Sequence, residues 1–299
     1  MSSTYTIVGL GELLWDLLPD GRQLGGAPAN FAYFTNLLGD RGVVASRVGD
    51  DDLGHAAAGR LRELGSSPEH LQFDSSHPTG TVQVRLDAAG QPEFEIARPV
   101  AWDFLQWTPA WKLLAEEADA VCFGSLAQRS PVSRETILQF VRSTRRQALR
   151  VFDVNLRAPF YSAEVLAASL ALADIVKLNN DELPVVARLL GIPFTGERAA
   201  AEALLRAYKA SLVCVTRGNC GSLLMSRQAA AEHPGYRVEV ADTVGAGDAF
   251  TATLVHHCLR GASLEEMNEA ANRVGAWVAS QVGATPVPQN GDLQLALAA

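Results

Sequence analysis

Asp242-Thr-Val-Gly-Ala-Gly-Asp248 is the most informative stretch of this 299-residue chain, and a run of helical composition follows it. We expect a helix over residues 248–260 that ends at Gly261. Gly245, Ala246 and Gly247 then lie at the N-terminus of this helix. Unpaired backbone N–H groups and the positive end of the helix dipole make such an N-terminus a binding site for an anion such as phosphate.

Asp248 is an acidic residue directly beside this predicted anion site. A carboxylate is an unusual choice if the site only binds an anion. It is a sensible choice if Asp248 accepts a proton from a hydroxyl group that attacks a phosphate. The structural alternative is a glycine-rich turn with a capping Asp, which is common in α/β proteins.

Short apolar runs that end in Gly or polar residues recur along the chain, with helical stretches between them. This pattern predicts an α/β fold, in which helices cover both faces of a mostly parallel sheet. Ligands of such sheets bind beyond the carboxyl ends of the strands. We therefore expect the polar residues that follow the runs to share one edge. The five runs are Thr6–Leu10, Ala120–Phe123, Arg150–Phe152, Asp174–Leu178 and Ser211–Val215.

Residues 11–25 and about 78–103 depart from this pattern and read as strands. The second segment alternates apolar and polar residues and has a turn at Ala88-Ala-Gly90, which indicates a hairpin. A small β-sheet inserted in an α/β domain suits a lid that excludes water from the site. We interpret residues 1–299 as one α/β domain with this discontinuous lid.

A second glycine cluster, Gly25-Gly26-Ala-Pro-Ala-Asn30, precedes a predicted helix that stops at Gly39. The two glycines allow a sugar ring to approach the backbone, and the Asn30 amide can both donate to and accept from hydroxyl groups. Asp16 lies among apolar neighbours in the predicted lid. Its alternative interpretation is an exposed strand position.

Composition excludes several classes of protein. A net charge of −8 opposes a nucleic-acid or anionic-membrane surface, and no apolar run approaches the roughly 18 residues of a membrane span. The N-terminus lacks the pattern of a signal peptide, so we expect a cytoplasmic protein. The four cysteines have no metal-site spacing and read as ordinary thiols. No P-loop motif is present, and Leu14 replaces the third glycine of a dinucleotide fingerprint, which opposes a nicotinamide-linked oxidoreductase.

Five segments together resemble the ribokinase-like (PfkB) family of carbohydrate and nucleoside kinases. The run from Gly25 through Asn30 to Gly54 is similar to the N-terminal pattern of the family, and Asp242–Asp248 is similar to the C-terminal one. Three shorter segments follow in the expected order, namely Asp153-Val-Asn-Leu-Arg157, Asn179-Asn-Asp-Glu182 and Thr216-Arg-Gly218. The resemblance covers nearly the whole chain. It implies a ribokinase-like three-layer α/β/α fold and an ATP-dependent sugar kinase.

The resemblance also implies roles for individual residues. Asp248 would be the general base, with an anion hole for the γ-phosphate made by Gly245, Ala246 and Gly247. Sugar hydroxyls would be held by Asp16, Gly26 and Asn30, and Arg157 would contact either a phosphate or a substrate oxygen. Mg²⁺ and its waters would be oriented by Asn179 and Glu182. The nucleotide would be bound by Asn179, Thr216, Gly218 and Asn272. Asp242 would be a candidate ligand of K⁺, although Val287 stands where relatives often carry a hydroxyl group.

Within the family, residues 11–19 and 24–32 are most similar to bacterial fructokinases. Fructose is therefore the expected substrate, and 2-keto-3-deoxygluconate, whose carboxylate would meet Arg157, is the alternative. Another sugar or nucleoside also stays open. A non-catalytic sugar-binding relative is disfavoured because Asp248 and the glycines are present. The resemblance further implies a homodimer formed through the lid.

Overall fold

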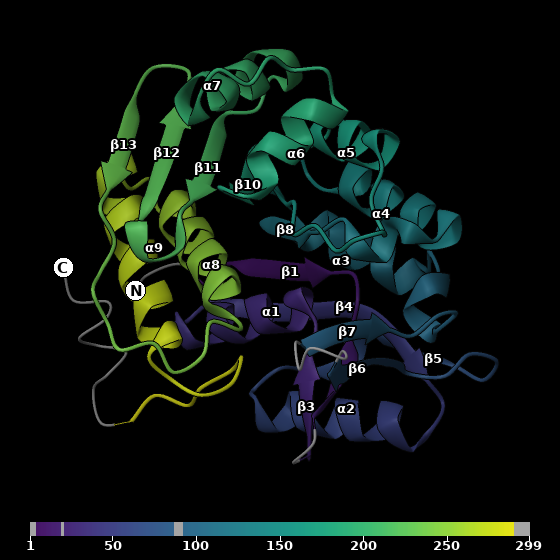
Figure 1. Cartoon of the computed structure of the whole chain (residues 1–299). Coiled ribbons are helices and arrows are strands. Elements are labelled where there is room, and N and C mark those ends of the chain that lie inside the picture. Colours follow the sequence, from purple (N-terminus) through teal and green to yellow (C-terminus); the bar gives the residue numbers. More distant parts are fainter. Residues whose placement is uncertain (1–3, 19–20, 87–91, 290–299) are drawn as a thin grey trace.

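The computed structural model describes residues 4–18, 21–86 and 92–289. Its main element is a nine-stranded sheet in the order β13-β12-β11-β10-β9-β8-β1-β4-β5 (Figure 1). The strands from β5 to β11 are parallel along the sheet, and β12 and β13 are antiparallel. The strands are β1 (Thr6–Leu10), β4 (Arg41–Gly49), β5 (Leu71–Asp74), β8 (Ala120–Phe123), β9 (Leu149–Asp153), β10 (Ile175–Asn179), β11 (Leu212–Thr216), β12 (Ser222–Ser226) and β13 (Ala230–His233).

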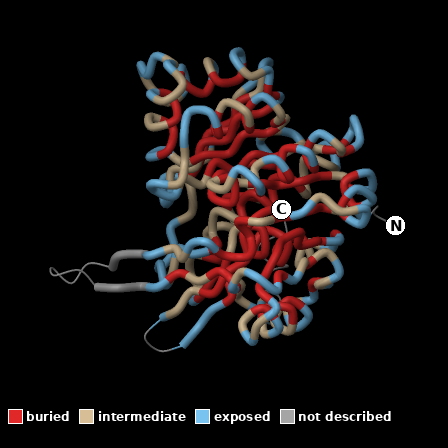
Figure 2. The backbone as a smooth tube through the Cα atoms, turned by 90° about the vertical axis from the view of Figure 1, so that its right-hand side faces the viewer, coloured by how far each residue is buried: buried red, intermediate tan, exposed pale blue. Residues whose placement is uncertain are grey.

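Helices cover both faces of this sheet, as expected for continuous apolar strands. One face packs against α3 (Pro109–Glu117), α4 (Pro131–Ser143), α5 (Ala163–Leu170), α6 (Glu182–Leu189) and α7 (Glu197–Tyr208). The other packs against α1 (Ala27–Leu37), α8 (Ala246–Leu259) and α9 (Leu264–Ala279). The sheet is the buried layer between them (Figure 2). The predicted three-layer α/β/α fold is confirmed.

A separate four-stranded sheet has the order β3-β2-β6-β7, from β2 (Leu14–Leu18), β3 (Gly21–Gly25), β6 (Gly80–Leu86) and β7 (Pro92–Ile96). Figure 1 shows this small sheet beyond the carboxyl end of β1. Apolar residues of β2 and β3 pack on α2 (Asp52–Glu63) in a satellite core. The predicted strands in 11–25 and 78–103 are thus present but shorter, and residues 101–104 form a 3₁₀ turn. The predicted turn at Ala88-Ala-Gly90 lies outside the described residues.

Two further findings concern the expectations from composition. The longest and most apolar helices of the described residues fall short of what a membrane span requires. All four cysteines are free thiols, two of them buried in the sheet.

Candidate active site

The candidate site lies where the order of the strands reverses. From β1 the chain continues to β4 and β5 on one side, whereas β8 to β11 follow on the other side. Such a switch point leaves a crevice beyond the carboxyl ends of the strands. A small gap at this place is lined by residues from β8, β9, α1 and α8, including Phe31, Gly124, Asp153 and Asp248.

The N-terminus of α8 points unpaired N–H groups into this region. In the part of the chain that the structure describes, the N–H groups of Gly245, Gly247 and Asp248 have no acceptor, whereas that of Ala246 donates to the carbonyl of Thr243 at 3.3 Å. The start of α8 therefore offers three N–H groups without an acceptor, and the third belongs to Asp248 and not to the predicted Ala246. An oxyanion placed there would receive fixed donors and the helix dipole.

Two glycines of this turn are required by their surroundings. Gly245 has φ +82°, and a Cβ there would lie 2.3 Å from the carbonyl oxygen of Ala284. A Cβ on Gly247 would lie 3.2 Å from Nζ of Lys177. The first glycine lets the turn rest on the loop after α9, and the second lets a buried ammonium group approach the anion hole.

Asp248 is half-buried and accepts a hydrogen bond from Nδ2 of Asn30 at 2.8 Å. Burial and the negative charge of Asp153 raise the pKa of Asp248 to about 6, against the opposing effects of Asn30, Lys177 and Arg157. The carboxyl group is thus ionised at neutral pH, but it is more basic than an ordinary aspartate. This combination suits a general base.

Lys177 is a site residue that the sequence interpretation did not single out. It lies on β10 beside Asp153 of β9, and its Nζ donates to Asp153 Oδ1 at 3.1 Å, with both side chains below 10% exposed. Thr251 of α8 donates to the other Asp153 oxygen at 2.9 Å. Burial opposes the charge of Lys177, but Asp153, Glu182 and Asp248 outweigh it and raise the Lys177 pKa. A fixed cation therefore lies behind the N-terminus of α8.

Glu12 is a second residue that the sequence interpretation missed. It is 4% exposed at the end of β1, and its Oε2 has no partner among the described residues. Burial raises the pKa of Glu12 to about 7, and the charge of Arg157 acts against this rise. The Oδ1 atom of Asn30 is also buried without a partner. Buried orphan oxygens are costly, so these two atoms fit a site that receives hydroxyl donors from a ligand.

The three remaining predicted sugar contacts surround the same place. Asp16 lies on β2, and its carboxylate reaches Gly25 of the neighbouring strand β3, where a Cβ would be only 2.4 Å from Asp16 Oδ2. Gly26 has φ +110° and lies against the carbonyl of Glu12, so its own backbone geometry requires glycine. Arg157 is exposed, and its charge lowers the pKa values of Glu12, Asp16 and Asp248 against the larger effect of burial. The chain thus brings these predicted residues together.

Asn179 and Glu182 form a compact turn between β10 and α6. Glu182 accepts from the N–H groups of Asn179 and Leu156, both at 2.8 Å, and Oδ1 of Asn179 accepts from the N–H of Glu182 at 2.8 Å. Each Glu182 oxygen is therefore already engaged. No cluster of three or more metal-ligating side chains occurs within the described ranges. The pair fits Mg²⁺ that is held mostly by phosphates and water, and does not fit a protein-only cage.

The predicted nucleotide-binding residues line the other half of the strand edge. Thr216 ends β11 opposite Asn179 of β10, and Gly218 follows with φ +57°. Asn272 of α9 is buried and donates to Ser222 Oγ at 2.7 Å and to Asn268 Oδ1 at 3.0 Å. Its amide nitrogen is thus engaged in an internal network that fixes α9 on β12.

Asp242, the predicted K⁺ ligand, organises the loop behind the anion hole. Its two carboxylate oxygens accept from the N–H groups of Val244, at 3.0 Å, and Gly283, at 3.2 Å. Val287 is 70% exposed. The carboxylate therefore joins the turn before α8 to the loop after α9, whether or not a cation binds.

Comparisons with known proteins show which proteins this chain is similar to. The model of the family described as pfkB family carbohydrate kinase matches residues 21–290. A fructokinase of Escherichia coli is 34% identical over 82% of this chain and 82% of its own length. The crystal structure of a fructokinase with bound ATP from Xylella fastidiosa superposes with a TM-score of 0.83, at 27% identity over 94% of each chain. A fructokinase from Vibrio cholerae O395, with fructose, ADP and calcium bound, has a TM-score of 0.80 at 27% identity, over 99% of this chain and 100% of that one.

Proposed function

The chain belongs to the pfkB family of carbohydrate kinases, and within this family we propose that it transfers the γ-phosphate of ATP to fructose, forming fructose 6-phosphate. The observation that carries the proposal is the half-buried Asp248 carboxylate beside unpaired N–H groups at the start of α8. The similarity to fructokinases supports the choice of sugar.

In the proposed reaction Asp248 accepts the proton of the attacking sugar hydroxyl. The hydroxyl oxygen forms a bond to the γ-phosphorus while the bond to the leaving ADP oxygen breaks. The N–H groups of Gly245, Gly247 and Asp248 hold the phosphoryl oxygens, and Lys177 supplies positive charge behind them. Phosphoryl transfer depends mainly on such positioning and charge stabilisation.

Substrate binding uses the residues around Asp248. Sugar hydroxyls donate hydrogen bonds to Asn30, to Asp16 and to the unpartnered oxygen of Glu12. The small sheet covers the crevice and excludes water. Thr216, Gly218 and Asn272 border the nucleotide. Mg²⁺ would neutralise phosphate charge, with Asn179 and Glu182 orienting its waters. A cytoplasmic location and a homodimer through the small sheet belong to the same proposal, as does K⁺ bound near Asp242.

Purified protein with ATP and Mg²⁺ is expected to release ADP when fructose is added. A coupled ADP-release assay across hexoses, ketohexonates, ribose and nucleosides measures this, and the product is identified as the 6-phosphate. Stronger turnover of 2-keto-3-deoxygluconate would favour the alternative in which Arg157 meets a carboxylate. Absence of ADP release with every acceptor would remove the proposed reaction.

The pH dependence of kcat/KM is expected to report the base. Because Asp248 must be ionised and its pKa in the free enzyme is about 6, kcat/KM should fall as the pH drops through 6 and level off above it. In a plot of log(kcat/KM) against pH, the low-pH limb should have a slope near one. A flat profile down to pH 5 would contradict the raised pKa.

A further inference from the structure

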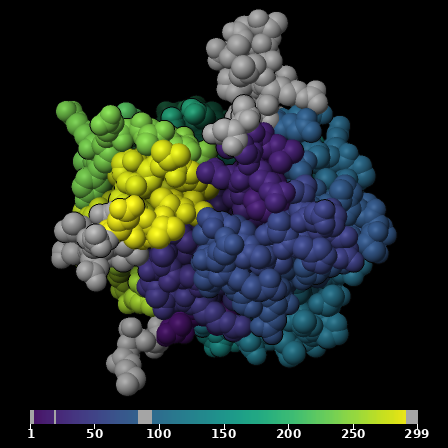
Figure 3. Space-filling view, turned by 90° about the horizontal axis from the view of Figure 1, so that it is seen from below, coloured from purple at the N-terminus to yellow at the C-terminus, as the bar shows by residue number. Residues whose placement is uncertain are grey.

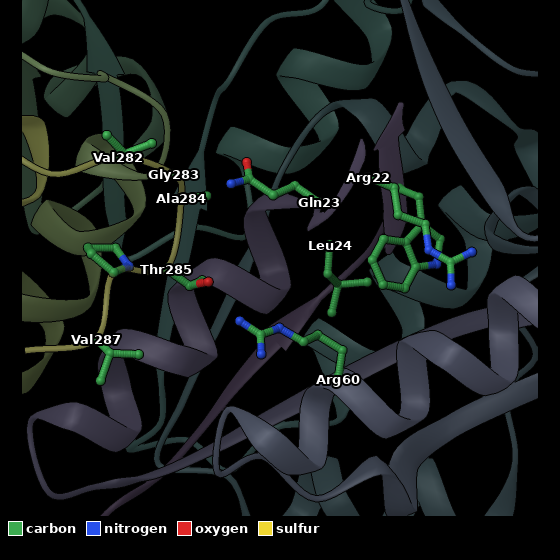
Figure 4. A pocket seen from close by; sticks show the side chains of 11 residues that line it. Arg22, Gln23, Leu24, Arg60, Val282, Gly283, Ala284, Thr285 and Val287 are labelled. Atoms are coloured by element: carbon green, nitrogen blue, oxygen red, sulfur yellow. The ribbon is translucent and has the colours of Figure 1, made fainter. Parts of the chain in front are cut away.

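A second cavity of about 500 Å³ lies outside the crevice described above. It is lined by residues 22–24 of the edge strand β3, by Trp15 of β2, by Arg60 of α2 and by the loop 282–287 (Figure 4). Figure 3 shows the same face, where the yellow C-terminal loop, the purple β2–β3 hairpin and α2 adjoin one another. None of the residues assigned to phosphoryl transfer lines this cavity.

The side chains that line the cavity favour an anion over a cation. Two guanidinium groups, Arg22 and Arg60, belong to it together with the amide of Gln23 and the hydroxyl of Thr285, and no carboxylate side chain of the described residues does. In Figure 4 Arg60 and Thr285 extend toward each other across the cavity. The chain as a whole carries a net charge of −8, so this local excess of positive charge departs from its surroundings.

The present partners of the two arginines are weak. Arg22 lies 4.9 Å over the ring of Trp15, and no carboxylate in the described part of the chain pairs with it. Arg60 pairs with Glu63 at 2.8 Å, but both side chains are at least 41% exposed. An exposed ion pair of this kind contributes little to stability. Arg60 can therefore readily exchange Glu63 for a phosphate dianion.

We propose that this cavity is a second binding site, for a small phosphate-bearing anion, and that it is distinct from the crevice that holds the substrates. Its volume is in the range of roughly 300–1,000 Å³ that small-molecule sites occupy. Trp15 and Leu24 supply an apolar wall, and Arg60 holds the phosphate group together with Thr285. Arg22, which lies over Trp15, adds positive charge at the other end of the cavity. The inference rests on the proposed function only in regarding the other crevice as the substrate site.

One wall of the cavity is also the support of the anion hole. The carbonyl of Ala284 lies against Gly245, and the N–H of Gly283 donates to Asp242. On the cavity side, Gln23 lies so close to Gly283 that a Cβ there would be 2.6 Å from its Nε2. A ligand that contacts this loop therefore changes the energy of the turn that holds the γ-phosphate. We expect occupancy of the cavity to change the KM for ATP.

Equilibrium dialysis of inorganic phosphate and of fructose 6-phosphate tests the site. The protein is first saturated with fructose and a non-hydrolysable ATP analogue, so that the substrate crevice is blocked. We expect the wild-type protein to bind one equivalent of at least one of these two ligands. The double variant Arg22→Gln/Arg60→Gln should bind it at least tenfold more weakly. Arg62→Gln, an exposed change on the same helix, is the matched control and should bind as the wild type does.

Kinase activity measured without added phosphate distinguishes a failure of the second site from a failure of the proposed reaction. The double variant should keep its basal kcat within about twofold, because neither arginine contacts the substrate crevice, and it should lose the effect of phosphate on the KM for ATP. Absence of binding to the blocked wild-type protein, or binding that survives the double substitution, would overturn the proposal. If the KM for ATP is the same with and without bound phosphate, the proposed coupling between the cavity and the anion hole is wrong.

Discussion

Replacing Asp248 by Asn is expected to lower kcat by about 10³, within the roughly 10²–10⁴ that general-base catalysis contributes. The amide has the shape of the carboxylate and can still accept the hydrogen bond of Asn30, so the pocket should keep its form. It cannot take the proton of the sugar hydroxyl. Stopped-time measurement of ADP formation gives kcat, and calorimetric titration of an ATP analogue should show binding close to that of the wild type.

Asp52→Asn is the matched control for Asp248→Asn. It removes the same charge from an exposed position in the first turn of another helix, α2, and should leave kcat nearly unchanged. The low-pH limb of kcat/KM should disappear in Asp248→Asn, since the titrating group is gone. Near-normal kcat in this variant would show that another group accepts the proton.

The sequence predicted the elements that carry a strong local signal. All five apolar runs became parallel strands at nearly the expected residues, because a buried parallel strand needs a continuous apolar stretch. Gly39 and Gly261 end their helices with positive φ, as predicted. The predicted anion hole rests on glycines that are contiguous with the helix that follows, and this helix is present as α8. Helix α8 begins at Ala246, two residues before the expected start.

Other elements carry no such local signal. Strand β4 was not predicted as a strand because polar and small residues interrupt it. The antiparallel strands β12 and β13 are short, and β13 has only one buried position. Lys177 stands inside an apolar strand, and only the register of β9 and β10 shows that it faces Asp153. Glu12 follows a strand end like many surface residues, and its burial depends on Gly26 and α1, which the local sequence does not reveal.

Substituting Lys177 by Met is expected to lower kcat by roughly 10²-fold, as loss of one preorganised charge at a reacting phosphate does. The KM for fructose should change little, because Lys177 lies behind the anion hole. The cation also lowers the pKa of Asp248, so the low-pH limb of kcat/KM should move to higher pH in this variant. Initial-rate kinetics as a function of pH measures both effects.

Lys177→Met also leaves Asp153 as a buried charge without its cation, which costs about 3–5 kcal/mol of stability. The double variant Lys177→Met/Asp153→Asn removes both charges and should recover most of the lost thermal stability. It should also bring the limb of kcat/KM back toward 6, since Asp153 raises the pKa of Asp248 and Lys177 lowers it. If Lys177 acts on the phosphoryl group, kcat stays low in the double variant. If the buried pair only stabilises the fold, kcat recovers together with stability, and the charge behind the anion hole has no part in the reaction.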